Sequence, residues 1–281
     1  MDNLKRILLV DDDAGTLETL TASLRDLAEI DTAPDAHHAL RQIRDGSYDV
    51  ILSEIQTPDM SGIELLRQIR RLQPDARVIM MAGEHTPDTV VKSIQHQAFS
   101  CLCKPFAVEV LRDAVQVALD ADHREDDIVL LSGRLNWISL SVRCKMELAD
   151  RILHFLRCMK TGLGQEEQDN VAIAFRELLI NAIEHGGHSD PGKRVHVSFV
   201  RTAGALIYHL QDPGEGFSFD NIPHAAISNK PDEPVRHAAI REELGIRPGG
   251  FGLLLTRNLV DELVYNEKGN EVMLVKYLKS K

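Results

Sequence analysis

The sequence has no apolar run close to the roughly 20 residues that a membrane-spanning helix needs. Its first residues, Met-Asp-Asn-Leu-Lys-Arg, lead into a short strand-like run and acidic residues, which is not the pattern of a signal peptide. Positive charge is scarce, with 32 Lys and Arg against 43 Asp and Glu and a net charge of −11. We therefore expect a cytoplasmic protein, and we expect neither a nucleic acid nor a membrane as its partner.

Cysteine is scarce as well, with four in 281 residues. Cys101 and Cys103 form a Cys-x-Cys pair without nearby partners, which is a poor zinc signature. The other two are Cys144 and Cys158. Free cysteine usually packs as a small hydrophobic residue, so we expect four buried thiols in a reducing compartment.

The length of 281 residues fits two domains, and the placement of charge indicates where they meet. Residues 1–125 hold 13 Lys and Arg against 22 Asp and Glu, a net charge of −9, whereas the remaining residues carry −2. A polar segment over residues 120–127 lies at this change. We predict an N-terminal domain over 1–122, a linker over 123–134 and a C-terminal domain over 135–281.

The N-terminal half alternates between short apolar runs, typical of strands buried on both faces, and helical spacing of apolar residues. Strands are predicted at 7–10, 28–33, 49–53, 78–81 and 101–103. Helices are predicted at 16–27, 62–72, 89–97 and 108–119. This order predicts an α/β domain whose parallel sheet has helices on both faces, with functional residues at the carboxyl ends of the strands.

Charged residues follow three of these predicted strands. Asp11 and Asp12 follow the first, Glu54 follows the third, and Lys104 follows the fifth. Converging acidic side chains suit Mg²⁺, and a lysine opposite them can hold a phosphoryl oxygen. An Asp-Asp pair alone would be typical of a solvated loop, but together with the lysine and the strand order it favours a site.

Residues 4–120 resemble a response-regulator receiver domain, which has a flavodoxin-like (βα)5 fold. The matching motifs are Val10-Asp11-Asp12, Pro58-Asp59-Met60-Ser61-Gly62 and Lys104-Pro105-Phe106. The resemblance implies a phosphate-accepting Asp at the position of Glu54, a switch Ser or Thr at Ala82, and an aromatic residue at Cys101. All three family residues are replaced in this chain.

The added methylene of Glu54 would place its carboxylate about 1.5 Å further out than an Asp carboxylate. In-line attack tolerates little misplacement, so we predict a receiver that is not phosphorylated. Glu54 would then act as a pseudo-phosphoacceptor that fixes one conformation, paired with Lys104. Alternatively, the domain serves only for docking or dimerisation.

The C-terminal half has a different pattern. Strands are predicted at 137–142, 195–199, 206–210 and 271–277, and helices at 145–159, 165–185 and 252–262. Hairpin-linked strands beside helices predict an α+β sandwich.

Three polar motifs lie in this half. Glu177, Asn181 and His185 are four residues apart on one predicted helix face, where a Glu can deprotonate a nucleophile and an Asn oxygen can ligate Mg²⁺. A solvated helix face would give the same spacing. Asp212-Pro-Gly-Glu-Gly216 follows an apolar strand, where two glycines let the backbone approach a ligand and Asp212 can bind an exocyclic amine such as that of adenine. A plain turn explains this segment equally well.

The third motif, Arg247-Pro-Gly-Gly-Phe-Gly-Leu253, opens a predicted helix whose free N–H groups favour a phosphate. The ordered set of three resembles the Bergerat ATP-binding fold of the gyrase, histidine-kinase and MutL superfamily over about residues 135–281. Within it, the anti-sigma-factor serine kinases are the most similar.

The resemblance implies that Glu177 is the catalytic base, Asn181 a Mg²⁺ ligand and Asp212 the residue that binds adenine. It places further residues around the nucleotide: His185, Gly214, Gly216, Gly249, Gly250 and Gly252. Arg247 is either a phosphate contact or a solvated charge. The segment between Phe217 and Gly249 would be the ATP lid.

We therefore expect a bacterial regulator that uses ATP and Mg²⁺ to phosphorylate a serine or threonine of a partner, an anti-sigma-factor antagonist by family analogy. One alternative is a non-catalytic, nucleotide-dependent module that sequesters a sigma factor. Another is an atypical histidine kinase, for which His123 and His154 are the candidates, although neither lies in the usual dimerisation segment with a His-Glu pair. A homodimer fits both resemblances.

Overall fold

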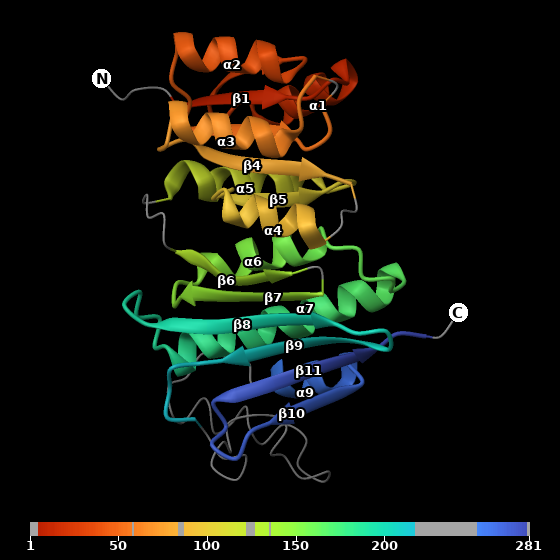
Figure 1. Ribbon diagram of the computed structural model, residues 1–281. Coiled ribbons are helices and arrows are strands. Elements are labelled where there is room, and N and C mark those ends of the chain that lie inside the picture. The colour runs from red at the N-terminus through yellow and green to blue at the C-terminus, as the bar shows by residue number, and fades with distance from the viewer. Residues whose placement is uncertain are drawn as a thin grey trace. The chain divides into compact units, whose positions relative to one another are not determined.

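The computed structural model describes residues 5–57, 59–83, 87–121, 127–134, 136–216 and 252–279 (Figure 1). The chain forms two compact units, one of residues 1–126 with 154–160 and the other of residues 127–153 with 161–281. No helix in the described part of the chain is long and apolar enough to cross a membrane.

The first unit contains a five-stranded parallel sheet in the order β2-β1-β3-β4-β5. Its strands are β1 (Arg6–Val10), β2 (Glu29–Ala33), β3 (Val50–Glu54), β4 (Arg77–Ala82) and β5 (Ser100–Cys103). Its helices are α1 (Ala14–Leu24), α2 (Ala36–Asp45), α3 (Gly62–Leu72), α4 (Pro87–Gln95) and α5 (Val108–Asp120). This is the flavodoxin-like doubly wound order, which confirms the predicted (βα)5 fold.

Strand β1 shows why its sequence is apolar at every position. Ile7 and Leu9 lie in one hydrophobic core with residues of α1 and α5, and the alternate residues Leu8 and Val10 are also fully buried. Successive side chains point to opposite faces of a strand, so both faces of this sheet are covered. Helix α2 was not predicted from the sequence. Two of its four buried residues are alanines, which give only a weak apolar pattern.

The second unit contains a six-stranded antiparallel sheet in the order β10-β11-β9-β8-β7-β6. Its strands are β6 (Ile128–Arg134), β7 (Trp137–Arg143), β8 (Arg194–Arg201), β9 (Ala205–Gln211), β10 (Glu262–Tyr265) and β11 (Glu271–Tyr277). Its helices are α7 (Gln165–Asn181), the π-helix η1 (Ala182–Gly186), α9 (Gly252–Leu259) and the part of α6 (Glu147–Arg157) up to residue 153. The predicted α+β sandwich is confirmed.

Helix α7 packs on this sheet through aromatic side chains. The ring of Phe175 lies 5.3 Å from that of Tyr208 on β9, which in turn lies 5.1 Å from Phe199 on β8. Helices α7 and α9 contact each other and lie behind the strands in the view of Figure 1. This pairing of α7 with α9 positions the candidate site.

Two strands differ from the sequence-based expectation. Residues 128–134, expected in the linker, form β6 and pair with β7. The predicted linker included these residues because the polar segment before them indicates a domain boundary. Residues 262–265, where a helix was expected to end, form β10, because α9 stops at Leu259 and the chain turns back to pair with β11.

Candidate functional site

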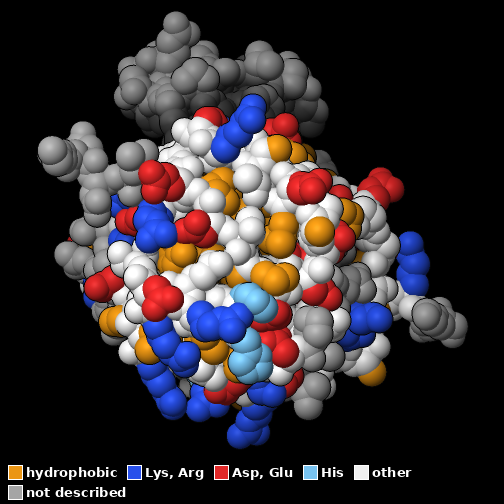
Figure 2. All heavy atoms as spheres, turned by 90° about the horizontal axis from the view of Figure 1, so that it is seen from above, with side chains coloured by type: hydrophobic (Ala, Val, Ile, Leu, Met, Phe, Trp, Pro, Cys, Tyr) orange, Lys and Arg blue, Asp and Glu red, His pale blue; other side chains and the backbone are white. Residues whose placement is uncertain are grey.

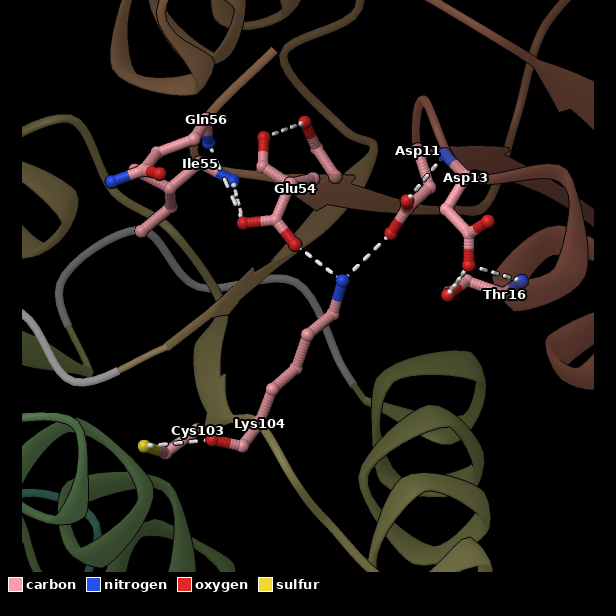
Figure 3. Close-up of polar contacts among 9 residues, drawn as sticks. Asp11, Asp13, Thr16, Glu54, Ile55, Gln56, Cys103 and Lys104 are labelled. Atoms are coloured by element: carbon pink, nitrogen blue, oxygen red, sulfur yellow. Dashed lines mark hydrogen bonds and ion pairs between the residues drawn. The ribbon is translucent and has the colours of Figure 1, made fainter.

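Lys104 lies between two acidic side chains at the carboxyl ends of the strands of the first unit (Figure 3). Its Nζ is 2.7 Å from Asp11 Oδ2 and also contacts Glu54 Oε2. Asp11 is 2% exposed and Glu54 is 9% exposed, whereas the lysine side chain is 31% exposed. Three of the residues predicted for this edge are therefore in contact, and the fourth, Asp12, is exposed.

The other oxygen of Glu54 is also engaged. Oε1 accepts hydrogen bonds from the backbone N–H of Ile55 at 3.0 Å and of Gln56 at 3.4 Å. The carboxylate therefore turns toward the two residues that follow it in the chain, as Figure 3 shows. Gly62 makes room for this strand end, because a Cβ there would overlap the Glu54 carbonyl oxygen.

Burial alone would lower the pKa of Lys104, but its hydrogen bonds and charge interactions with Asp11 and Glu54 outweigh burial and raise the pKa. The lysine is therefore held as an ammonium ion. Ser53, Ala82 and Cys101 are all buried, and the Ser53 hydroxyl donates to the Glu54 carbonyl oxygen at 3.1 Å. Ser53 thus does not add a second nucleophile to the site.

Replacing Lys104 with methionine should destabilise the first unit by about 2–3 kcal/mol at neutral pH. The change leaves Asp11 and Glu54 buried side by side without their cation, and a fully buried pair broken in this way costs about 3–5 kcal/mol. Partial exposure of Lys104 reduces that cost. Hydrogen exchange of the β1 and β3 amides measures the effect within this unit.

The pH dependence has a defined sign. A lysine whose pKa is raised by folding contributes its stability below the ordinary lysine value of about 10.4, and loses it as pH rises through the folded value. The difference between wild type and Lys104→Met should therefore persist from neutral pH to about pH 10 and shrink above it. Lys92→Met, which breaks an exposed pair with Asp88, is the matched control, with an expected loss below about 0.5 kcal/mol. An equal loss in both variants would contradict the assignment.

In the second unit, the carboxyl group of Glu177 lies against the start of α9. A Cβ at Gly252, the first residue of α9, would overlap this carboxyl group. A helix N-terminus presents free N–H groups and favours negative charge. Glu177 on α7 and the predicted phosphate-binding end of α9 are therefore adjacent, although they are 75 residues apart in sequence.

Asp212 directly follows β9, and its carboxyl group lies between Gly186 and Gly214 in space. Its Oδ1 accepts a hydrogen bond from the Gly214 N–H at 2.8 Å, and a Cβ at Gly186 would overlap its carboxyl group. Burial raises the pKa of Asp212, and the Gly214 N–H only partly opposes this. Within the part of the chain that the structure describes, Oδ2 has no hydrogen-bond donor. Asp212 is thus a half-buried carboxylate with one acceptor oxygen available to a ligand.

The turn between β10 and β11 supports the loop that carries Asp212. The backbone N–H of Asp212 donates to the Asn270 carbonyl at 3.0 Å, and Lys268 Nζ donates to the Gly214 carbonyl at 3.1 Å. Gly216 has a φ of +82°, and a Cβ there would overlap the Lys268 carbonyl oxygen. Gly216 is therefore needed both for its backbone conformation and for this close approach.

Sequence reasoning missed Lys268 and Asn270. The signal for them was the cluster of turn residues Asn266-Glu-Lys-Gly-Asn270 before a strand. Asn266 Oδ1 caps this turn, accepting hydrogen bonds from Gly269 at 2.7 Å and Asn270 at 3.1 Å. The turn became interpretable as a hairpin only once β10 was known.

A π-helix changes the end of the predicted helix over 165–185. Asn181 is the last residue of α7, and the following turn is the wider η1, in which the Gly187 N–H bonds to the Ala182 carbonyl five residues earlier. The wider turn moves His185 out of the α-helical register of Glu177 and Asn181, and His185 is exposed. π-Helical turns are rare in proteins, but a large share of them occur at functional sites. In this turn, Gly186 lies against the carboxyl group of Asp212.

Some predicted residues lie outside the described residues. These are Arg247, Gly249, Gly250, the lid segment between Phe217 and Gly249, and His123. Their predicted roles stay predictions.

Comparison with known families identifies both units. Residues 7–116 match the family described as response regulator receiver domain, and residues 142–276 match the one described as histidine kinase-like ATPase domain. The chain is a receiver domain joined to a histidine kinase-like ATPase domain. This pairing supports a signalling regulator that carries an ATPase module.

Individual relatives match a smaller part of the chain. It is 35% identical over 117 residues to the DNA-binding transcriptional regulator NtrC of Azospirillum brasilense, covering 41% of this chain and 24% of that protein. It is 36% identical over 110 residues to the two-component response regulator ARR11 of Arabidopsis thaliana, covering 38% and 21%. The chain thus spans about a quarter or less of these curated relatives. A solved CheY-like receiver domain of Methanospirillum hungatei JF-1 is 32% identical, with a TM-score of 0.41, covering 42% of this chain and 95% of that one.

Proposed function

We propose that the ATPase-family unit is an ATP-dependent protein kinase that phosphorylates a serine or threonine of a partner-switching protein, of the anti-sigma-factor-antagonist type. The observation that supports this most is how α7 and η1 join the three motifs. Glu177 on α7 lies against Gly252 of α9, and Gly186 of η1 lies against Asp212. One continuous helical segment thereby connects the base candidate, the phosphate-binding helix end and the adenine-binding candidate.

The described residues fit a nucleotide. The available Oδ2 of Asp212 would accept the amine of adenine, and Gly214 would let the backbone approach the base. The N-terminus of α9 at Gly252 would bind phosphate oxygens. Asn181, one helical turn beyond Glu177, would supply an amide oxygen to Mg²⁺, which offsets phosphate charge when it is bound.

In the proposed reaction, the hydroxyl oxygen of the partner forms a bond to the γ-phosphorus of ATP, the bond to the β,γ-bridging oxygen breaks, and ADP leaves. Glu177 accepts the hydroxyl proton through its carboxylate. The Glu177 carboxylate lies at the start of α9, where the phosphates of ATP are proposed to bind. This position supports the role, because a general base must lie close to the phosphoryl group that is transferred.

The test is transfer of radiolabelled γ-phosphate from ATP to purified candidate antagonist proteins, taken from a pull-down with the full chain. We expect acid-stable label on serine or threonine of the partner, located by phosphosite mapping. Acid-labile label on His123 or His154 of this chain would instead identify a histidine kinase. Tight, nucleotide-dependent partner binding without transfer would identify the non-catalytic module that sequesters a sigma factor.

The receiver is proposed to recruit or control this unit without being phosphorylated. Both oxygens of Glu54 are engaged, by Lys104 and by the backbone of Ile55 and Gln56, which leaves no unengaged oxygen for attack. Incubation of wild type with acetyl phosphate and Mg²⁺ should therefore add no phosphoryl group to the intact mass.

The matched variant is Glu54→Asp, which shortens the side chain and frees its carboxylate from the strand end. We expect this variant to gain an acid-labile phosphoryl group under the same conditions, with Lys104 and Asp11 unchanged. A stable, acid-labile adduct on Glu54 of the wild type would refute the proposal.

A further inference from the structure

A second cluster of charged side chains on the receiver does not include Lys104. It consists of Asp35 and His37 at the start of α2 and of Asp59 in the loop between β3 and α3. One ligand atom from each of these three residues lies within 4.8 Å of the others. Figure 2 views the molecule from the α2 side, and histidine side chains lie beside acidic ones there.

The two carboxylates have capping roles that fix their positions. Asp35 is the N-cap of α2 and accepts from the His38 N–H at 2.7 Å. Asp59 reaches the same helix end from another loop, with Oδ1 accepting from Ala36 N–H at 3.3 Å and Oδ2 from His37 N–H at 3.0 Å. Two acidic side chains from different segments therefore meet at one turn of helix.

Capping does not account for the imidazoles. His37 Nδ1 also contacts Asp59 Oδ2, and His38 Nδ1 is 2.6 Å from Asp35 Oδ2. The His37 side chain is 67% exposed and that of His38 is 49% exposed, so neither ring is held there by packing. His37 Nδ1 faces Asp59 Oδ2, which also accepts the His37 N–H, whereas His38 Nδ1 faces Asp35 Oδ2 and the His38 N–H goes to Asp35 Oδ1.

Hydrogen bonds from the start of α2 also affect both carboxyl groups. Burial would raise the pKa of Asp59, but hydrogen bonds from His37 and from the backbone of Ala36 outweigh it and lower the pKa to about 2. The backbone N–H of His38 likewise lowers the pKa of Asp35. The cluster therefore places two carboxylates and one imidazole nitrogen close together at the start of α2.

We propose that Asp35, His37 and Asp59 form a site for a divalent transition-metal ion of the Zn²⁺ type. One imidazole nitrogen with carboxylate oxygens suits such ions better than Mg²⁺ or Ca²⁺, which prefer oxygen ligands alone. In a tetrahedral site with bonds of about 2.0–2.1 Å, ligand atoms stand roughly 3.4 Å apart, so small side-chain rotations suffice. Water would complete the coordination on the exposed side.

The ion would take the place of the direct contact between His37 Nδ1 and Asp59 Oδ2. It would also tie α2 to the loop that begins directly after Glu54 and is closed by a bridge between Gln56 and Ser61. Metal binding at this position would therefore stabilise the receiver, in proportion to the ion concentration relative to its dissociation constant.

The test is calorimetric titration of Zn²⁺ into the metal-free full chain, compared among three variants. His37→Ala removes the imidazole but keeps both backbone caps, and Asp59→Asn keeps an acceptor oxygen for the caps but loses the negative charge. His96→Ala, a receiver histidine outside the cluster, is the control. We expect one binding event in wild type and His96→Ala that weakens at least tenfold in His37→Ala and in Asp59→Asn.

A second readout separates binding from folding. Zn²⁺ should slow hydrogen exchange of the first α2 amides in wild type but not in His37→Ala, while metal-free His37→Ala exchanges like metal-free wild type. Identical isotherms for wild type, His37→Ala and Asp59→Asn would overturn the proposal. So would a wild-type chain that takes up no Zn²⁺ at micromolar concentration.

Discussion

Replacing Glu177 with alanine is expected to reduce phosphoryl transfer to the partner by about 10²–10⁴-fold, the usual contribution of a general base. Nucleotide affinity should stay within a few-fold of wild type, because Glu177 would act on the attacking hydroxyl and not on the base or ribose. The expected pattern is a loss of kcat with little change in the KM for ATP. Single-turnover transfer of radiolabelled phosphate and a separate nucleotide titration measure the two effects.

Glu166→Ala is the matched control for this prediction. Glu166 is an exposed acid on the first turn of the same helix, α7, and its loss should leave transfer unchanged. Full transfer activity in Glu177→Ala would refute its assignment as base. A parallel loss of nucleotide binding would instead indicate that the carboxylate positions the start of α9.

Replacing Asp212 with alanine is expected to weaken nucleotide binding by about ten- to a hundredfold. The change removes the only proposed acceptor for the adenine amine, and a lost hydrogen bond to a charged group is worth about 1.5–3 kcal/mol. The loss should be smaller for a nucleotide whose base lacks that amine, such as an inosine nucleotide, because that ligand never makes the contact. Calorimetric titration with both nucleotides measures the difference.

Although Asp212→Ala should bind nucleotide more weakly, it should not be less stable than wild type. Folding raises the pKa of Asp212 through burial, so the ionised carboxylate disfavours the folded state above the unfolded value of about 3.9. Removing it should leave the unfolding midpoint unchanged or raise it slightly at neutral pH. Glu215→Ala, an exposed acid in the same loop, should alter neither binding nor stability. Unchanged nucleotide affinity in Asp212→Ala would contradict the adenine contact.

The sequence predicted the receiver strands well because they are covered on both faces. A run such as Ile7–Val10 is apolar at every position, and local pattern alone then locates the strand. The meeting of Asp11, Glu54 and Lys104 was predictable for the same reason, since the carboxyl ends of parallel strands share one edge. The direction in which the Glu54 carboxylate bends was not, because it depends on the N–H groups of Ile55 and Gln56 at the strand end.

The ATPase-family unit was less predictable because antiparallel pairing joins distant segments. Strand β10 has four residues and is defined by its pairing with β11, so the local sequence pattern did not predict it. The roles of Lys268 and Asn270 in supporting the Asp212 loop follow from that pairing. The π-helix is equally hidden, since the spacing of Glu177, Asn181 and His185 fits a continuous α-helix until the backbone hydrogen bonds are known.

Of the four cysteines expected to be buried, three are buried and Cys103 is not. All four are thiols and not disulfides, with Cys101, Cys144 and Cys158 buried and Cys103 partly exposed. Burial raises the pKa of Cys144 to about 11, so this thiol stays protonated and unreactive at neutral pH. Composition sufficed here because the argument needed only the number and spacing of the residues.

The contact of Lys104 with both Asp11 and Glu54 has a consequence for how information could pass through the receiver. If Glu54 is not phosphorylated, as proposed above, the charge distribution of this site is the same whatever the supply of phosphate donors. Such a domain would carry no phosphoryl group that reports earlier donor levels. Its contribution to signalling would then be set by gene expression and protein turnover, which makes the abundance of the chain the adjustable quantity.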